Sequence, residues 1–198
     1  SREVVDRFNL GYDPAFSRDT GRETWHALII PTGRTSYTVR NIGPSRDRYR
    51  KQGPVQIFNK TALRTALKPV FVVEGELDAL SVISVGGEAV ALGNVENYGH
   101  LLKLLETEKP AQPLIVALDN DEEGVKAADK LSEGLERLKI PYYKFNPYGE
   151  HKDANEALTA DRENFAASVA GAEHMEDEAR EAEIETYMQT CAGSCFEE

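Results

Sequence analysis

The stretch PVFVVEG, at residues 69–75, decides the fold that this sequence predicts. Its four apolar residues, 70–73, run without a break into Glu74 and Gly75. A run this short, unbroken and largely β-branched is typical of a strand buried on both faces of a parallel sheet. Because ligands of such sheets bind beyond the carboxyl ends of the strands, Glu74 is predicted to stand at a functional edge.

The residues that follow alternate between helical and extended patterns. ELDALSVIS (76–84) places apolar residues on one helical face, and two glycines then end the helix. Further strands are predicted in EAVALGN (88–94), PLIVALDNDEEG (113–124) and 140–145, and further helices in HLLKLLETE (100–108), VKAADKLSEGLERL (125–138) and from Asp153 onward. This alternation predicts an α/β fold with a mostly parallel sheet flanked by helices.

Residues 1–68 have a different pattern, which predicts a small α/β subdomain. TWHALIIPT (24–32) and SYTVRNI (36–42) are predicted to be antiparallel strands, with Trp25 and His26 in the core. GYDPAF (11–16) has the residues of a turn. GPSRDRYRKQG (43–53) is expected to be a loop, because it carries four cationic residues around one tyrosine, and VQIFNK (55–60) to be a short strand.

Charge is divided unevenly along the chain. Residues 1–68 contain 13 Lys and Arg against 6 Asp and Glu, whereas residues 69–198 contain 10 against 28. A basic surface suited to polyanions is therefore expected beside an acidic one suited to divalent cations. We predict three parts: a basic subdomain (1–68), a sheet domain (69–160) and an acidic helical tail (161–198).

Composition excludes some classes of protein. No apolar run approaches the roughly 18 residues of a membrane helix, and no signal-peptide core begins the chain, so a cytoplasmic location is expected. Cys191 and Cys195 are too sparse for a structural zinc site and are expected to be free thiols. The ends of the sequence suggest a fragment of a longer polypeptide.

Carboxylates follow three of the predicted strands. Glu74 follows the first, Asp119 and Asp121 the third, and Asp153 and Glu156 the fourth. In a parallel sheet these ends lie side by side, where like charges repel unless a cation neutralises them. Mg²⁺ suits this role, since it takes one or two carboxylates together with waters and substrate phosphates.

Each acidic segment also has a purely structural explanation. A D-x-D segment is commonly a turn or a helix N-cap, and Asp153 with Glu156 could form a capping box. Glu74 is harder to explain in this way, because a carboxylate directly after four buried residues is costly unless it is used or paired. The three segments together favour a metal site.

The segments VVEGELDALS (72–81), ALDNDEEG (117–124) and HKDANEAL (151–158) resemble the Toprim domain of bacterial-type primases, topoisomerases, OLD-type nucleases and RecR-like proteins. The resemblance implies that Glu74 is a metal ligand or general acid/base and that Asp119 and Asp121 are catalytic metal ligands. Asp153 is added to the ligands, with Asp78 and Glu156 supporting them. The implied cofactor is Mg²⁺ or Mn²⁺, with two ions when substrate is bound. Asn120, where primases often have Gly, and Ala154-Asn155 depart from the pattern.

The basic segment resembles the region that precedes the Toprim domain in primases of the bacterial DnaG type. Arg40, Arg48-Tyr49 and Phe58-Asn59-Lys60 occur in the expected order. The resemblance implies a DNA primase core, of phage or mobile-element type, that binds single-stranded DNA template and NTPs and works with a replicative helicase, fused or separate. The residues implied or expected to bind nucleotide or DNA are Arg40, Arg46, Arg48, Arg50, Lys51, Lys60 and Lys152.

Three alternatives stay open. A metal-dependent nuclease would use the same carboxylates, and a topoisomerase is less favoured because no large strand-passage domain accompanies the motifs. The third is a non-catalytic DNA-binding or recombination-mediator module. The cationic residues could instead belong to an ordinary solvated loop, and Tyr49 could equally stack on a base or pack half-buried.

Overall fold

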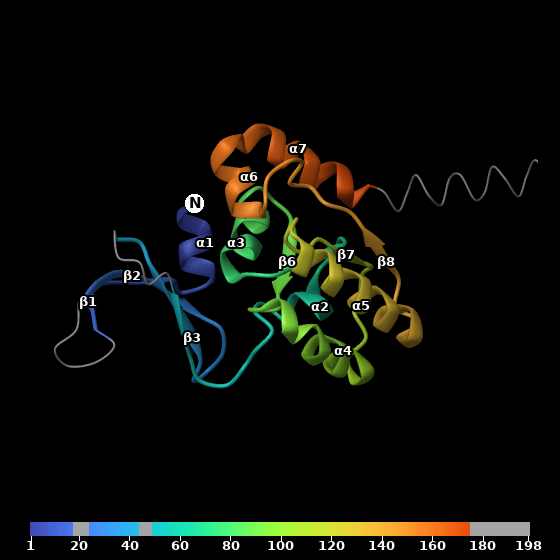
Figure 1. The fold of residues 1–198 in the computed structure, drawn as a ribbon, viewed down its shortest axis with the longest axis horizontal. Helices are drawn as coiled ribbons and strands as arrows, with labels where there is room; N and C mark the ends of the chain where they lie inside the picture. The colour runs from blue at the N-terminus through green and yellow to red at the C-terminus, as the bar shows by residue number, and fades with distance from the viewer. Residues whose placement is uncertain (18–23, 44–48, 175–198) are drawn as a thin grey trace, which may run out of the picture.

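The structure, a computed structural model, describes residues 1–17, 24–43 and 49–174. Two of the predicted binding residues, Arg46 and Arg48, lie outside these ranges, as do Cys191, Cys195 and most of the predicted acidic tail. The described residues form two four-stranded sheets, with helices arranged around the second (Figure 1). No helix within these ranges is long and apolar enough to cross a membrane.

The second sheet is parallel and has the strand order β6-β5-β7-β8. Its strands are β5 (Val70–Val73), β6 (Glu88–Ala91), β7 (Leu114–Val116) and β8 (Tyr142–Lys144). β5 pairs with both β6 and β7, and all four of its residues are buried. The predicted parallel sheet is thereby confirmed, with PVFVVEG at its centre.

Alternate residues of β5 pack into two hydrophobic layers. Phe71 and Val73 pack with residues of α3 (Glu76–Ser84), α6 (Ala154–Ala160) and α7 (Arg162–Glu173). On the opposite face, Val70 and Val72 pack with residues of three other helices, α2 (Ala62–Thr65), α4 (Tyr98–Thr107) and α5 (Glu122–Leu138). The short helix η1 (Val95–Asn97) precedes α4. The period of two fixes the direction in which each side chain of the strand points.

The first sheet is antiparallel, in the order β1-β2-β3-β4, and follows α1 (Arg2–Arg7). Its strands are β1 (Gly11–Phe16), β2 (Trp25–Pro31), β3 (Tyr37–Asn41) and β4 (Tyr49–Gln52). The predicted pairing of β2 with β3 is confirmed. Two predictions are wrong: the expected turn at 11–16 is β1, and the expected loop at 43–53 contains β4.

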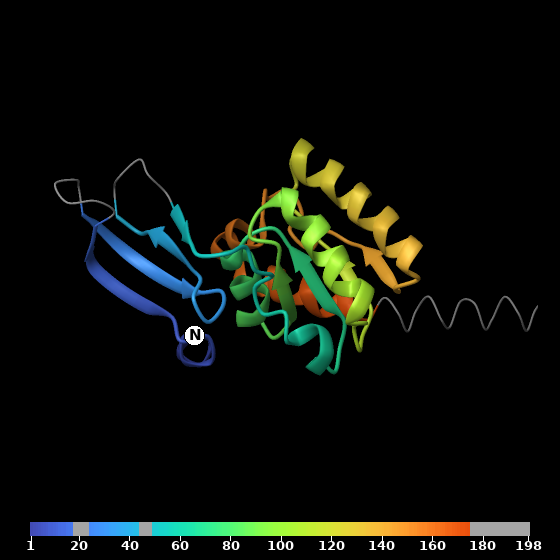
Figure 2. The ribbon, with the colours of Figure 1, turned by 90° about the horizontal axis from the view of Figure 1, so that it is seen from below.

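The segment between the sheets is held to the parallel sheet. The predicted strand at 55–60 is wrong, because only Phe58 makes a β-bridge, with backbone hydrogen bonds of 2.9 and 3.3 Å to Ala91. The Phe58 ring is 2% exposed and packs on Phe8, with 5.1 Å between ring centroids. An ion pair of 2.9 Å joins Arg7 of α1 to Glu88 of β6. Figure 2 shows the antiparallel sheet at one end of the molecule, joined through this segment to the parallel sheet and its helices.

Candidate metal and nucleotide site

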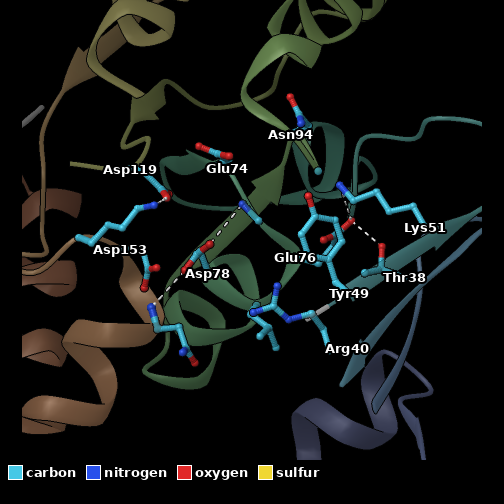
Figure 3. A pocket seen from close by; sticks show the side chains of 15 residues that line it. Thr38, Arg40, Tyr49, Lys51, Glu74, Glu76, Asp78, Asn94, Asp119 and Asp153 are labelled. Atoms are coloured by element: carbon cyan, nitrogen blue, oxygen red, sulfur yellow. Dashed lines mark hydrogen bonds and ion pairs between the residues drawn. The ribbon is translucent and has the colours of Figure 1, made fainter. Parts of the chain in front are cut away.

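A cleft of about 280 Å³ lies between the carboxyl ends of the parallel strands and the antiparallel sheet. Figure 3 shows acidic side chains on one wall and basic and aromatic side chains on the other. Its main polar lining residues are Thr38, Arg40, Tyr49, Lys51, Glu74, Glu76, Asp78, Asn94, Asp119, Lys152, Asp153 and Asn155. Residues of the antiparallel sheet and of the parallel-sheet domain therefore share one cavity.

The acidic wall brings together the predicted carboxylates that follow β5 and β7. Partial burial, followed by the charges of Asp119 and Asp121, raises the pKa of Glu74 to about 7. Partial burial, followed by the charge of Asp153, raises the pKa of Asp119 to about 6. These carboxylates act on one another because their strands end at the same edge of the sheet.

Lys152 supplies a positive charge within this acidic group. Its Nζ lies 3.0 Å from Asp121 Oδ2 and 3.5 Å from Asp119 Oδ2. A backbone hydrogen bond of 2.7 Å from Asn120 N to Lys152 O holds the two loops together. The ammonium therefore bridges the two acids of the D-x-D segment.

Asp121 also begins α5. Its Oδ1 accepts a 2.9 Å hydrogen bond from Gly124 N, so it is the N-cap of that helix. This backbone bond, followed by the bond from Lys152, holds the pKa of Asp121 below its usual range. The helix-cap interpretation of D-x-D and the convergence of its acids are thus both correct, since Oδ1 caps the helix while Oδ2 faces Lys152.

Asp78 of α3 is bonded to the start of α6, and Asp153 caps α6. Asp78 is 8% exposed, and its carboxylate accepts hydrogen bonds of 3.2 Å from both Gly75 N and Asn155 N. Burial raises the pKa of Asp78 to about 7, with further contributions from Asp153 and Asp119. Asp153 caps α6 through a 2.8 Å bond from Glu156 N.

Glu156 is exposed, and its contact is with the backbone before α6. Its Oε2 accepts a 2.7 Å bond from Lys152 N, so it holds the backbone that carries Lys152. Asp153 caps α6 as expected, but the reciprocal bond of a capping box is not formed, because Glu156 bonds the backbone N of Lys152 and not that of Asp153. Glu156 is not among the residues that line the cleft.

The basic wall consists of side chains from one face of β3 and β4. Tyr49 lies between two cations, with Arg40 Cζ 5.7 Å and Lys51 Nζ 5.8 Å from its ring centroid. Tyr49 is exposed and lines the cleft, so it is not the half-buried packing residue of the alternative interpretation. Both cations line the cleft opposite the carboxylates.

Glu76 links the two walls and was missed by the sequence reasoning. It is 7% exposed, and its Oε1 accepts a 2.9 Å hydrogen bond from Thr38 Oγ1. Lys51 Nζ lies 3.8 Å from the same oxygen. The available signal was a second carboxylate two residues after Glu74, in the first turn of the helix after a buried strand.

Two predicted binding residues are placed away from the cleft. Arg50 is paired with Val39, so it points to the face of β4 opposite that of Tyr49 and Lys51. Lys60 is exposed in the turn after Phe58 and is not among the cleft residues. Sequence order alone did not separate the two faces of β4.

Comparison with known proteins agrees with this geometry. Residues 71–158 match the family model described as Toprim-like. These residues form a Toprim-like domain. No curated protein sequence matches the chain.

Two solved structures share the fold of this Toprim-like domain and its neighbouring sheet. The Aquifex aeolicus primase (zinc-binding and RNA polymerase domains) has a TM-score of 0.59 at 18% identity, covering 86% of this chain and 53% of that one. A chain in the bacteriophage T7 lagging-strand DNA polymerase complex with gp4 primase domains, an RNA/DNA hybrid and dTTP has a TM-score of 0.53 at 18% identity, covering 83% and 94%. The fold therefore resembles primase catalytic domains, and the chain spans about half the length of the Aquifex protein.

The chemistry of the Toprim-like domain fits a divalent cation. Within residues 1–17, 24–43 and 49–174, no three His, Cys, Asp or Glu side chains already form a complete metal-binding group. Mg²⁺ does not need one, because it commonly binds one or two carboxylates and completes its shell with water and phosphate. The raised pKa values of Glu74 and Asp119 reflect partial burial and repulsion between carboxylates, and a bound cation would relieve that repulsion.

Without metal, this Toprim-like domain is expected to lose stability as the pH rises from about 4 to about 7. The pKa values of Glu74, Asp78 and Asp119 are raised from 4.5, 3.8 and 3.8 to about 7, 7 and 6. The folded state therefore holds these protons more tightly than the unfolded chain does. Stability from these groups is greatest below pH 4 and is lost as they ionise in the folded state.

Urea unfolding in EDTA, compared between about pH 5 and about pH 8, measures this effect. Added Mg²⁺ is expected to raise the unfolding midpoint more at the higher pH, because protons compete with the metal for the carboxylates. Glu122→Gln removes an exposed carboxylate of α5 and is the control, since it should change neither trend. A Mg²⁺ effect of equal size at both pH values would contradict the prediction.

Proposed function

We propose that this chain is the catalytic core of a DNA primase, which joins nucleotides into short primers on single-stranded DNA. The proposal rests on one observation: an acidic wall and a basic wall face each other across one cleft. Glu74 and Asp119 stand on the acidic wall, and Arg40 and Lys51 stand on the basic wall. A nucleoside triphosphate with its metal ions needs both kinds of group within one site.

The acidic residues would hold Mg²⁺ or Mn²⁺. Glu74, Asp119 and Asp121 are the proposed ligands, with Asp153 beside them. Bound divalent cations would neutralise the triphosphate and activate the primer 3′-hydroxyl for in-line displacement. Lys152 bridges the two acids of the D-x-D segment, so it is placed to contact the phosphates when its carboxylates bind metal.

Glu74 is proposed to move the proton. In this alternative role, as a general base rather than a metal ligand, its carboxylate can accept and release a proton near neutral pH, because its pKa without metal is about 7. Asp78 would keep the loop after β5 in place through its bond to Gly75 N. Fixing that loop fixes the direction of the carboxylate at Glu74.

The basic wall is proposed to bind the triphosphate and the template backbone. Arg40 and Lys51 offer fixed positive charges, and Tyr49 between them offers a ring on which a base can stack. Glu76 would hold Lys51 and Thr38 in position from the Toprim-like domain. The T7 structure supports this proposal, because that complex contains primase domains bound to an RNA/DNA hybrid and dTTP.

A template-directed synthesis assay tests the proposal. Purified protein with single-stranded DNA, labelled NTPs and Mg²⁺ or Mn²⁺ is expected to make short oligonucleotides complementary to the template. Lys51→Ala is expected to raise the KM for NTP by about tenfold or more, since it removes a charge-assisted phosphate contact. Arg64→Ala, an exposed cation of α2 that pairs with Glu108, is the matched control and should change little.

The same assay separates the alternative functions. Metal-dependent loss of template without incorporation would overturn the proposal in favour of a nuclease. Neither synthesis nor degradation, with single-stranded DNA still bound, would overturn it in favour of a non-catalytic binding module. Synthesis that needs no template would contradict it as well.

A further inference from the structure

A line of side chains crosses the antiparallel sheet from the cleft to its outermost strand. Tyr49 of β4 is paired with Arg40 of β3, Arg40 with Leu28 of β2, and Leu28 with Tyr12 of β1. Residues directly opposite one another in neighbouring strands share a face of the sheet. These four side chains therefore lie on the face that forms the basic wall of the cleft.

The outer end of this line is a fixed pair of rings. The Tyr12 hydroxyl and His26 Nδ1 share a hydrogen bond of 2.6 Å. Their rings are stacked, with 6.2 Å between centroids and 29° between planes. Tyr12 is 58% exposed and His26 is exposed as well, so the pair offers flat, oriented ring surfaces to solvent.

Packing does not account for this pair. The buried residues of β2 on the opposite face, Trp25 and Ala27, form the hydrophobic cluster of this sheet together with Val39 of β3. Leu28 lies on the same face as the pair. It is partly buried and packs against the hydrophobic cluster that contains Phe71 and Val73 of β5. Neither Tyr12 nor His26 belongs to any of the hydrophobic clusters of the described residues.

We propose that Tyr12 and His26 form a base-stacking site that continues the template path beyond the cleft. Three steps between neighbouring strands, of about 4.8 Å each, separate Tyr12 from Tyr49 by about 14 Å. Arg40 lies between the two aromatic positions and supplies a cation for the backbone phosphates. Stacking platforms that alternate with positive charge bind single strands of any sequence.

Single-stranded DNA is the occupant that the surface favours. Bases of a single strand are free to stack on exposed rings, whereas those of a duplex are already stacked on one another. The basic excess of residues 1–68 suits a polyanion, and the pair is continuous with the cleft that we propose for the template. This inference rests on the proposed function for the direction of the strand, but its binding step can be measured without synthesis.

The test compares the binding of short and long single strands. Fluorescence anisotropy with labelled oligo(dT) of about 4 and about 16 nucleotides, in EDTA and without NTPs, excludes catalysis. The double variant Tyr12→Ala/His26→Ala is expected to weaken binding of the longer strand about tenfold and to leave the shorter one unchanged. Tyr12→Phe keeps the ring and should retain most of the affinity.

Tyr37→Ala is the matched control. Tyr37 is a 36% exposed tyrosine of β3, and its position next to Thr38 places it on the opposite face of the same sheet. It should leave both affinities unchanged, and thermal unfolding of every variant shows whether the fold is kept. Equal weakening by Tyr37→Ala, or no weakening by the double variant, would overturn the inference.

Two further comparisons separate this inference from the proposed function. Duplex DNA of the longer length should bind the double variant as it binds the unaltered protein, and an equal loss on duplex would overturn the stacking site. If the protein makes primers but the double variant binds the longer strand as tightly as the unaltered protein does, only this inference is overturned. If the double variant binds the longer strand more weakly but the protein makes no primers, the primase proposal is overturned and the stacking site is kept.

Discussion

Asp119→Asn is expected to lower the rate of template-directed nucleotide incorporation by more than about 100-fold while the protein stays folded. Loss of a residue that only supports a metal ligand costs about 10- to 100-fold, so loss of a ligand should cost more. The substitution keeps the size of the side chain and removes its charge. Lys152 keeps its 3.0 Å contact with Asp121, so the loop retains one of its two ion pairs.

Glu122→Gln is the matched control for this substitution. Glu122 lies three residues further along, begins α5, is exposed and pairs with Lys126. The variant loses the same unit of charge but should keep its incorporation rate. Single-turnover incorporation with saturating Mg²⁺ measures both variants. Full activity of Asp119→Asn, or equal loss in both variants, would refute the assignment of Asp119.

Gly124→Ala is expected both to destabilise the protein and to reduce incorporation. A Cβ at Gly124 would lie 2.1 Å from the carbonyl oxygen of Asp119, which is a steric clash with the backbone. Either the start of α5 or the backbone of the D-x-D segment must therefore move, at a cost of about 1–3 kcal/mol. A displacement of about 1 Å at a reacting group can lower the rate about 100-fold. Urea unfolding and the incorporation assay give the two results.

Gly171→Ala separates this effect from the general effect of losing a glycine. Gly171 lies within α7, and a Cβ there would meet no atom within 4 Å. Alanine is the better helix former, so this variant should be about 0.5–1 kcal/mol more stable and fully active. If Gly124→Ala behaved in the same way, the close contact between α5 and Asp119 would not matter to the site.

The parallel sheet could be predicted because its sequence signals are local and strong. Four apolar residues followed by Glu74 allow one main interpretation, and the strand is fully buried at the centre of the sheet. The acids that follow β5 and β7 then converge as a consequence of parallel topology. The resemblance of the flanking motifs to the Toprim domain indicated which acids to consider as site residues. The match of residues 71–158 to the Toprim-like family model agrees with that resemblance.

The antiparallel sheet was harder to predict, because pairing between strands, and not the local sequence, decides that residues 11–16 and 49–52 are extended. GYDPAF contains turn residues, yet it pairs with β2, with a register shift between Asp13 and Phe16. The cationic segment of β4 extends because β3 offers it hydrogen bonds, and long basic side chains are tolerated on either face of an exposed strand. Trp25 was correctly expected in the core, but the alternation of the strand exposes His26.

The bridge at Phe58 has a consequence for how copies of this protein meet in solution. An unpaired outer strand is a template for self-association, and Phe58 satisfies part of β6 through two backbone hydrogen bonds. At the other flank, β8 has only three residues and ends in Lys144, whose charge opposes the addition of a further strand. Replacing Phe58 by proline would remove the donor to Ala91, and the variant is then expected to aggregate more readily at high protein concentration.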